Sequence, residues 1–269
     1  MNEKLLKVEN LKVSYHTYAG EVQAVRGVSF ELNEGETIAL VGESGCGKSV
    51  TARSLMRLNK VPPAEIKEES KVLFQGKDIY QLSEKELCQY RGGSVSMIFQ
   101  DAMAALNPTM TIGNQIVENI RHHSSLSKKE AMEKAIVLLK KVGLSEPNKR
   151  IKQYPHELSG GMRQRVMIAI AFANEPKLLI ADEPTTALDV TIQAQIVQLL
   201  KRLNSKKNTA ILFISHDLSL VRKLCTKVIV MQNGHIVERG NTEDIYQNPQ
   251  EVYTKQLIAA IPKCEKNFE

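Results

Sequence analysis

The sequence predicts an α/β fold whose central sheet is mostly parallel and is covered on both faces. In the second half of the chain, apolar strand-like runs alternate with helical patterns, which favours crossover connections between parallel strands. A glycine-rich loop joins an apolar run to a helical pattern, and residues 5–32 show the two-residue alternation of β-strands. A helical stretch in the middle interrupts this order, and we expect it to be an insertion.

The N-terminal segment, residues 5–32, is expected to be rich in β-strand. Its apolar side chains alternate loosely with polar ones, and a turn is predicted near Ala19 and Gly20. After a break at Pro62–Pro63, strand signals return at 71–74 and at 94–100.

The glycine-rich loop follows the pattern G-x-x-x-x-G-K-[ST] between a strand and a helix signal. The apolar run 37–41 precedes it, and 50–58 is predicted to be a helix with Leu55, Met56 and Leu58 on its buried side. Small residues let backbone N–H groups wrap a polyphosphate at the positive end of a helix. We expect a phosphate site formed by Gly42, Glu43, Ser44, Gly45, Cys46, Gly47, Lys48, Ser49 and Val50.

Two side chains of the loop and two carboxylates predict chemistry at this site. Lys48 can reach the β- and γ-phosphates, and Ser49 offers a hydroxyl to Mg²⁺. Asp182 and Glu183 follow the apolar run 178–181, and ligands of open α/β sheets bind at the carboxyl ends of strands. Asp182 can hold Mg²⁺ through water, and Glu183 can polarise the water that attacks the γ-phosphate. The phosphate loop alone leaves kinases, GTPases and motor ATPases open.

The middle of the chain, 111–142, changes to the helical period. Apolar residues recur there at helical spacing, most clearly Ala131, Ala135, Leu138, Leu139 and Val142. Two later helical patterns lead into or out of the apolar strands 178–181 and 210–214. Near the end, Asn233–Gly234 lies between two strand signals and predicts a hairpin with a type I′ turn.

Composition excludes several classes of protein. The 269 residues are 42% hydrophobic and 25% charged, which is ordinary for a globular protein with a buried core. No run approaches the ~18 apolar residues that a membrane span needs, and the N-terminus has no signal-peptide pattern. The formal charge of +6 could attract nucleic acid, anionic lipid headgroups or an anionic nucleotide. No aromatic residues that could stack on bases are interleaved with the basic groups, so we expect no nucleic-acid partner. The scattered cysteines predict neither disulfides nor a zinc site.

A second serine-glycine element, Ser159-Gly160-Gly161, opens a predicted helix and suggests another anion site. Alone it could equally be a helix N-cap with a flexible lead-in. Gln100 and His216 each stand at the end of a predicted strand. Along the sequence, the order is the phosphate loop, Gln100, the serine-glycine element, the two carboxylates and His216. This joint pattern resembles the ATP-binding cassette family.

The resemblance covers nearly the whole chain and implies a P-loop NTPase fold with a RecA-like core. It implies a small antiparallel β-subdomain and an inserted helical subdomain. We expect a single domain over 1–269, with the core and β-subdomain at about 1–100 and 163–247, the helical subdomain at about 101–162 and a short tail at 248–269.

The resemblance also implies roles for single residues. Tyr15 is similar to the aromatic residue that stacks on adenine, and Gln100 to the residue that links Mg²⁺ and the attacking water to the helical subdomain. His216 resembles the histidine that contacts the γ-phosphate, and Asp189, in Ala187-Leu188-Asp189, resembles an acid that faces a partner subunit. We thus expect catalysis by Glu183, His216, Lys48 and Gln100, Mg²⁺ ligation through Ser49, Gln100 and Asp182, and ATP as the nucleotide.

Within the family, residues 101–111, 189–193 and 248–262 resemble the peptide and nickel importer branch. Met162, the fifth residue of the serine-glycine signature, resembles that branch as well. Two departures matter. Met162 replaces the usual glutamine of the serine-glycine element and cannot donate its hydrogen bonds, so no ligand role passes to it. Longer members end in a cysteine-rich tail, whereas only Cys264 remains here, so no iron–sulfur cluster is expected.

The resemblance therefore implies an ATP-hydrolysing subunit of an importer at the cytoplasmic face of the cell membrane. Its expected partners are two transmembrane permeases, a second cassette subunit, identical or homologous, and indirectly an extracytoplasmic solute-binding protein. Short peptides are favoured as cargo over nickel or a metal chelate. Two alternatives remain open: a cassette ATPase that acts on DNA or ribosomes, and a nucleotide-binding regulator without turnover.

Overall fold

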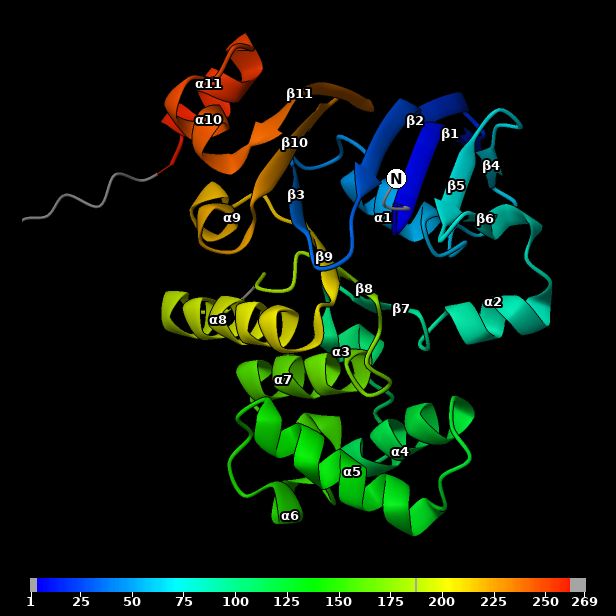
Figure 1. Ribbon diagram of the computed structural model, residues 1–269, viewed down its shortest axis with the longest axis vertical. Helices are drawn as coiled ribbons and strands as arrows, with labels where there is room; N and C mark the ends of the chain where they lie inside the picture. The colour runs from blue at the N-terminus through cyan, green and yellow to red at the C-terminus, as the bar shows by residue number, and fades with distance from the viewer. Residues whose placement is uncertain (1–3, 187, 262–269) are drawn as a thin grey trace, which may run out of the picture.

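Two β-sheets and a group of helices organise the chain (Figure 1). The computed structural model describes residues 4–186 and 188–261. The N-terminal sheet is antiparallel, with the order β2-β1-β5-β6 and with β4 paired to β1. Its strands are β1 (Leu6–Thr17), β2 (Gly20–Leu32), β4 (Ala64–Ile66), β5 (Lys71–Phe74) and β6 (Lys77–Asp78). The predicted β-rich N-terminus is thus confirmed, with the turn at Tyr18 and Ala19.

The central sheet has the order β11-β10-β3-β9-β8-β7, and every pair is parallel except β10 with β11. Its strands are β3 (Thr37–Val41), β7 (Val95–Ile98), β8 (Leu178–Asp182), β9 (Ala210–Ile214), β10 (Lys227–Gln232) and β11 (His235–Asn241). Asn233 and Gly234 have φ values of 48° and 83° between the last two strands, as a type I′ turn requires. Both the parallel sheet and the hairpin are therefore confirmed.

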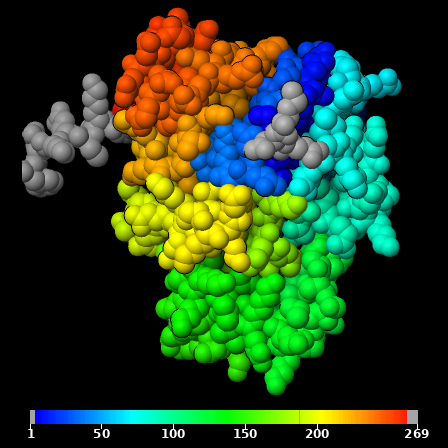
Figure 2. All heavy atoms as spheres, viewed as in Figure 1, coloured from blue at the N-terminus to red at the C-terminus, as the bar shows by residue number. Residues whose placement is uncertain are grey.

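The helices connect and cover these strands. They are α1 (Lys48–Ser54), α2 (Glu84–Tyr90), α3 (Ala102–Ala105), α4 (Ile112–His122), α5 (Lys128–Lys141), α6 (Pro147–Arg150), α7 (Gly160–Ala171), α8 (Val190–Lys207), α9 (Leu218–Leu224), α10 (Thr242–Gln247) and α11 (Val252–Ala259), with 3-10 turns at Ile79–Gln81 and Pro155–Glu157. Figure 2 shows the green residues of the helical region at one end of the molecule and the red residues of the C-terminal helices at the other.

The two faces of the central sheet pack against different partners. Because side chains alternate along a strand, Ala39 and Phe213 face one apolar cluster while Leu40 and Leu212 face another. The first cluster joins the sheet to α4, α5 and α7 to α9, and the second joins it to the N-terminal sheet, α1 and α2. The sheet is therefore covered on both faces, as expected, but much of the second cover is the antiparallel sheet rather than helices.

Two helix boundaries differ from the prediction. The helix after the phosphate loop ends at Ser54, not at 58, because Arg57 takes a left-handed φ of 50°, and Leu58 is 37% exposed rather than buried. The helical stretch 111–142 is broken between α4 and α5. Ser127 starts α5 with a capping box, in which it accepts the N–H of Glu130 while the Glu130 carboxylate accepts the Ser127 N–H. The helical spacing of apolar residues predicted the helices but not the break between α4 and α5.

Some sequence-based predictions fall on residues that the structure does not describe. These are the first three residues of the N-terminus, Ala187 of the Ala187-Leu188-Asp189 segment, Pro262 and Cys264, which all lie outside the described residues. Among the described residues, no helix combines the length and the apolar content that crossing a membrane requires.

Candidate functional site

The phosphate loop leaves the carboxyl end of β3 and runs directly into α1. Gly47 is the N-cap of α1 with φ of 105°, and a Cβ there would lie 2.4 Å from the backbone oxygen of Ala24. Gly42 has φ of 150°, and its Cβ would lie 2.2 Å from the backbone oxygen of Met231. Both positions require glycine, because the conformation and the close backbone approach each exclude a side chain. The loop is thus shaped by β2 and β10 on its two sides.

Lys48 holds the loop together from within. Its ammonium group is buried, with 4% of the residue exposed, and donates to the backbone oxygens of Gly42 at 2.7 Å and Glu43 at 2.8 Å. It also lies 3.7 Å from the sulfur of Cys46, which is itself buried. A buried ammonium that is satisfied only by neutral carbonyls is poorly compensated. A phosphate anion placed in the loop would therefore be a strong competitor for it.

Two of the three predicted Mg²⁺ ligands meet where the end of β8 approaches the start of α1. The Ser49 hydroxyl donates to Oδ1 of Asp182 at 2.9 Å. Burial raises the pKa of Asp182 above its ordinary value, although Ser49 and the positive charges of Arg53 and Lys48 oppose that shift. A hydroxyl and a carboxylate are the hard oxygen donors that Mg²⁺ prefers, so this pair fits the ion.

Three side chains lie against Glu183, two from distant parts of the chain and one from its own loop. Its Oε2 accepts from Gln100 Nε2 at 3.2 Å and from Thr186 Oγ1 at 3.0 Å, and His216 Nδ1 lies 3.3 Å away. Glu183 also has a left-handed φ of 47°, a strained conformation that tends to occur at functional sites. The three residues predicted to be catalytic around the water are thus brought together. Thr186 was missed, since a threonine in a loop carries no signal until the loop folds back.

Tyr15 lies on β1, and a short relay connects it to the helix that follows the phosphate loop. Its hydroxyl donates to Oδ1 of Asn59 at 3.2 Å, and the Asn59 amide donates to the hydroxyl of Ser54 at 2.7 Å. Tyr15 is half-buried, so part of its ring faces solvent. Its predicted contact with adenine remains a prediction.

The serine-glycine element is not joined to the phosphate loop by any hydrogen bond among the described residues. Ser159 is the N-cap of α7, and its hydroxyl accepts the N–H of Met162 at 3.3 Å. Asp189 caps α8 in the same way, through the N–H of Ile192 at 3.0 Å. Both residues are exposed, and Gly160 and Gly161 are half-buried beside them. Gly160 nevertheless lines a cavity together with Gln100 and Thr186, so this element lies near the Glu183 group rather than at the phosphate loop.

A residue near the C-terminus contacts the phosphate loop directly and was given no role from the sequence. The hydroxyl of Tyr253, on α11, accepts the backbone N–H of Glu43 at 2.8 Å. Tyr253 is only 7% exposed, and burial raises the pKa of its phenol. The segment that was expected to be a short tail therefore folds back onto the candidate site. No local pattern could reveal this contact between residues so far apart in the chain.

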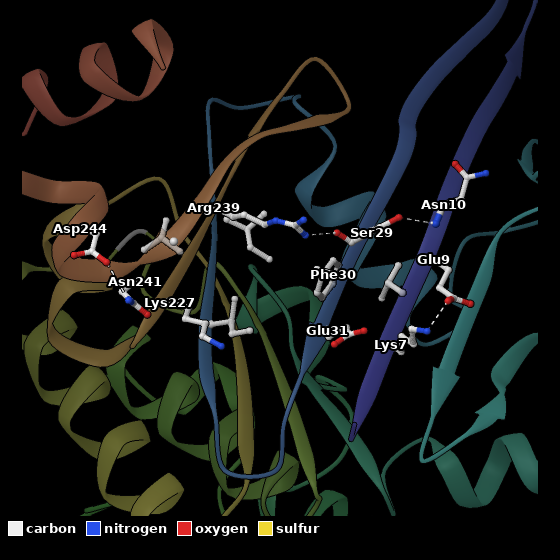
Figure 3. Close-up of a pocket in the computed structure, with 15 residues that line it drawn as sticks. Lys7, Glu9, Asn10, Ser29, Phe30, Glu31, Lys227, Arg239, Asn241 and Asp244 are labelled. Atoms are coloured by element: carbon white, nitrogen blue, oxygen red, sulfur yellow. Dashed lines mark hydrogen bonds and ion pairs between the residues drawn. The ribbon is translucent and has the colours of Figure 1, made fainter. Parts of the chain in front are cut away.

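A cavity of about 810 Å³ lies away from this site, between the N-terminal sheet and the β10–β11 hairpin (Figure 3). Charged groups line it, and several have partners: Lys7 pairs with Glu9 at 2.7 Å, Lys227 pairs with Glu36 outside the cavity at 2.6 Å, and Arg239 donates to the backbone oxygen of Ser29. None of the predicted site residues lines it. It is therefore not the candidate nucleotide site.

Comparison with known proteins identifies the family. The family described as ABC transporter matches residues 25–186, which is more than half of the chain. The oligopeptide transport ATP-binding protein OppD of Bacillus subtilis is 53% identical over 99% of this chain and 74% of its own length. The dipeptide transport ATP-binding protein DppD of the same organism is 52% identical over 98% of this chain and 79% of its own length.

Solved structures agree with the sequence relatives. The ATP-binding cassette MJ0796, solved as a dimer in a post-hydrolysis state with ADP and Pi, has a TM-score of 0.79 and 28% identity over 88% of this chain and 98% of its own. The cassette cbiO1 of Clostridium perfringens, part of a cbiONQ complex, has a TM-score of 0.76 and the same identity over 91% of this chain and 92% of its own. The chain therefore belongs to the ABC transporter family, as an ATP-binding and ATP-hydrolysing cassette.

Proposed function

We propose that this ATPase powers the uptake of di- or oligopeptides through a membrane importer. The arrangement around Glu183 carries the catalytic part of the proposal, and the names of the most similar relatives, which are oligopeptide and dipeptide transport proteins, support the cargo. These relatives favour peptides over nickel. They also favour transport over a role on DNA or ribosomes.

Each charged group has a proposed task. Lys48 exchanges its two loop carbonyls for the β- and γ-phosphates of ATP. Gln100, Thr186 and His216 all lie against one oxygen of Glu183, Oε2, and no hydrogen bond to the other oxygen, Oε1, is found among the described residues. This asymmetry supports Glu183 as the base that holds and polarises the attacking water through Oε1. His216, with its side chain 62% exposed, can then reach the γ-phosphate.

Ser49 and Asp182 would hold Mg²⁺ together with the phosphates, and Gln100 would complete that set. The ion supplies charge that offsets the negative charge of the triphosphate. Burial disfavours the charged form of the Asp182 carboxylate and so raises its pKa. A cation bound beside the carboxylate would offset that cost.

The surface formed by the exposed Ser159 and Asp189 and the half-buried Gly160 is proposed to complete the ATP site of a second cassette, identical or homologous. The start of α7 offers backbone N–H groups and a helix dipole to an anion, but not to the phosphate loop of its own chain. ATP would join two cassettes, and hydrolysis would release them. Tyr15 would stack on the adenine ring.

A groove of about 570 Å³ is the proposed docking surface for the permeases. Docking there would hold the chain at the cytoplasmic face of the membrane. The groove lies where β7 meets the helical region, and Leu58, Phe99, Ala105, Asn107 and Met110 line it. Phe99 is 39% exposed and the neighbouring Met103 is 55% exposed, so apolar surface is available to a partner. Because Gln100 directly follows Phe99, movement at the γ-phosphate site can reach this groove.

Uptake in a deletion strain tests the proposal. Cells that lack this chain should lose growth on di- or oligopeptides, and the wild-type gene should restore it. The variant Ala104→Arg changes an exposed residue of α3 next to Ala105, which lines the docking groove, and should bind ATP normally but fail to restore growth. Ala259→Arg, which adds the same charge at the exposed end of α11, is the matched control and should restore growth.

Two outcomes would change the proposal. Growth on peptides that survives the deletion, together with lost uptake of nickel or a metal chelate, would replace the peptide cargo. Loss of neither uptake would contradict the importer function itself.

A further inference from the structure

One peptide unit of the phosphate loop is held from both ends. The carbonyl of Gly42 and the N–H of Glu43 belong to the same planar group. The carbonyl accepts from the ammonium of Lys48 at 2.7 Å, and the N–H donates to the hydroxyl of Tyr253 at 2.8 Å. The orientation of this peptide therefore depends on a side chain from the other end of the sequence. If the Tyr253 hydroxyl were absent, the Glu43 N–H would lose its partner and the Gly42–Glu43 peptide plane could rotate.

The element that carries Tyr253 is fixed to the sheet rather than hanging free. The carboxylate of Glu238, on β11, accepts the backbone N–H of Gln250 at 2.8 Å and of Glu251 at 3.2 Å, which are the residues that lead into α11. Although burial opposes it, the N–H of Gln250 holds the pKa of Glu238 below its ordinary value, so the carboxylate stays charged near neutral pH. The ring of Tyr253 belongs to the apolar cluster of the helical face.

The β10–β11 hairpin contacts the same loop a few residues further along. The N–H of Gly234 donates to the carbonyl of Cys46 at 3.1 Å, and the backbone of Met231 passes so close to Gly42 that no side chain would fit there. Residues 231–253 thus meet the phosphate loop at Gly42, Glu43 and Cys46. This is a continuous support built from the C-terminal part of the chain.

We propose that Tyr253 is a positioning residue for the phosphate loop: its hydroxyl fixes the Gly42–Glu43 peptide, so that the C-terminal segment sets the affinity for nucleotide phosphate. Tyr253 acts through the loop and does not touch the attacking water. Its loss should therefore weaken nucleotide binding while leaving the rate of the chemical step nearly unchanged. The inference rests on the proposed phosphate-binding role of Lys48 and its loop.

Equilibrium binding of Mg²⁺·ADP to the full chain, by calorimetry, tests this inference. Tyr253→Phe removes only the hydroxyl, and we expect it to raise the Kd about three- to tenfold, the usual effect of losing one hydrogen bond. The matched control is Tyr246→Phe, on α10, whose hydroxyl bonds to the backbone oxygen of Leu218 and not to the loop. It should bind as the wild type does. In the assembled transporter, Tyr253→Phe should raise KM for ATP by a similar factor with kcat within about twofold.

Two further measurements connect the effect to the Glu43 N–H. Hydrogen exchange of the peptide that contains Glu43 should become faster in Tyr253→Phe and stay unchanged in Tyr246→Phe. Glu43→Pro removes the same N–H, and adding Tyr253→Phe to it should weaken binding no further.

The outcomes separate this inference from the proposed function. If Lys48→Ala weakens binding but Tyr253→Phe does not, the positioning role is wrong and the phosphate site stands. An equal loss in Tyr246→Phe would also contradict it, because the effect would then be general loosening of the C-terminal segment. If Lys48→Ala binds as tightly as the wild type, the proposed phosphate site itself fails.

Discussion

The phosphate loop and the start of α7 are both glycine-containing helix N-termini, yet their surroundings are opposite. At the loop, the backbone carbonyl oxygens of Ala24 and Met231 leave no room for a side chain at Gly47 and Gly42. Lys48 is buried there. At α7, Ser159 is exposed and bonds only within its own helix turn, and a Cβ on Gly160 would meet nothing nearer than Leu188 at 3.7 Å. The phosphate loop is therefore enclosed by its own chain. The start of α7 is an open surface, and we propose that it becomes a nucleotide site when a partner covers it.

The largest effect should come from the chemistry beside the first region. Glu183→Gln should retain ATP binding but lower turnover at least about 100-fold, since an amide can hold the water but cannot polarise it as a carboxylate does. Steady-state and single-turnover assays of the assembled transporter measure this, with the exposed Glu146→Gln as the control. Near-normal turnover by Glu183→Gln would remove this residue from the catalytic step.

A pair of glycine substitutions sharpens the comparison. Gly47→Ala should weaken nucleotide binding to the isolated chain about tenfold or more and lower the unfolding midpoint, because its φ of 105° and the Ala24 oxygen at 2.4 Å both oppose a side chain. Gly160→Ala, at the first position of α7, should leave both quantities nearly unchanged. Nucleotide titration and thermal unfolding measure them. Equal tolerance at the two positions would mean that the regions do not differ as described.

The smallest effect concerns stability. Burial raises the pKa of Asp182 in the folded chain above its unfolded value, so the folded state binds this proton more tightly. Stability is then lost as pH rises from the unfolded pKa through the folded pKa, and the penalty is complete above both. Asp182→Asn keeps an acceptor for Ser49 and removes that charge.

We therefore expect Asp182→Asn to stabilise the nucleotide-free chain at neutral pH by about 1 kcal/mol while it abolishes the response to Mg²⁺. Chemical denaturation at pH 7 and at acidic pH, where the gain should shrink, checks this. If Asp182→Asn were less stable than the wild type at neutral pH, the charged Asp182 carboxylate would not destabilise the nucleotide-free chain, and this account would be wrong.

The parts of the site that could be predicted are those whose signal is local. The phosphate loop, the paired carboxylates after β8 and the strand-end residues Gln100 and His216 each follow from a short run and its place in the alternation. The roles of Gln100 and His216 beside Glu183 came from the resemblance to the ATP-binding cassette family, and the structure brings both side chains to that carboxylate. Ser159 and Asp189 were expected to serve a partner; both are exposed, and that role stays a prediction.

What could not be predicted depends on the folded conformation rather than on a short sequence pattern. Tyr253 meets the site only after α11 folds back, and Thr186, three residues after Glu183, turns its hydroxyl to that carboxylate only in the folded loop. The early end of α1 reflects a left-handed turn at Arg57 that no glycine announces. The break before α5 is different, since Ser127 and Glu130 already form the S-x-x-E pattern of a capping box in the sequence. Weighing that pattern against the helical spacing would have placed the break.

Nucleotide affinity of the isolated chain tests the central claim most directly, with Lys48→Ala compared against Ser159→Arg. Lys48→Ala should weaken ATP binding at least about tenfold, because it removes the buried ammonium of the chain's own site. Ser159→Arg should bind within about twofold of the wild type and yet abolish turnover in the assembled transporter, since Ser159 is proposed to serve the neighbouring site. Ser127→Arg replaces another N-cap serine and controls for the lost cap. If Ser159→Arg weakened binding to the isolated chain as much as Lys48→Ala does, the division into a finished site and a shared surface would be wrong.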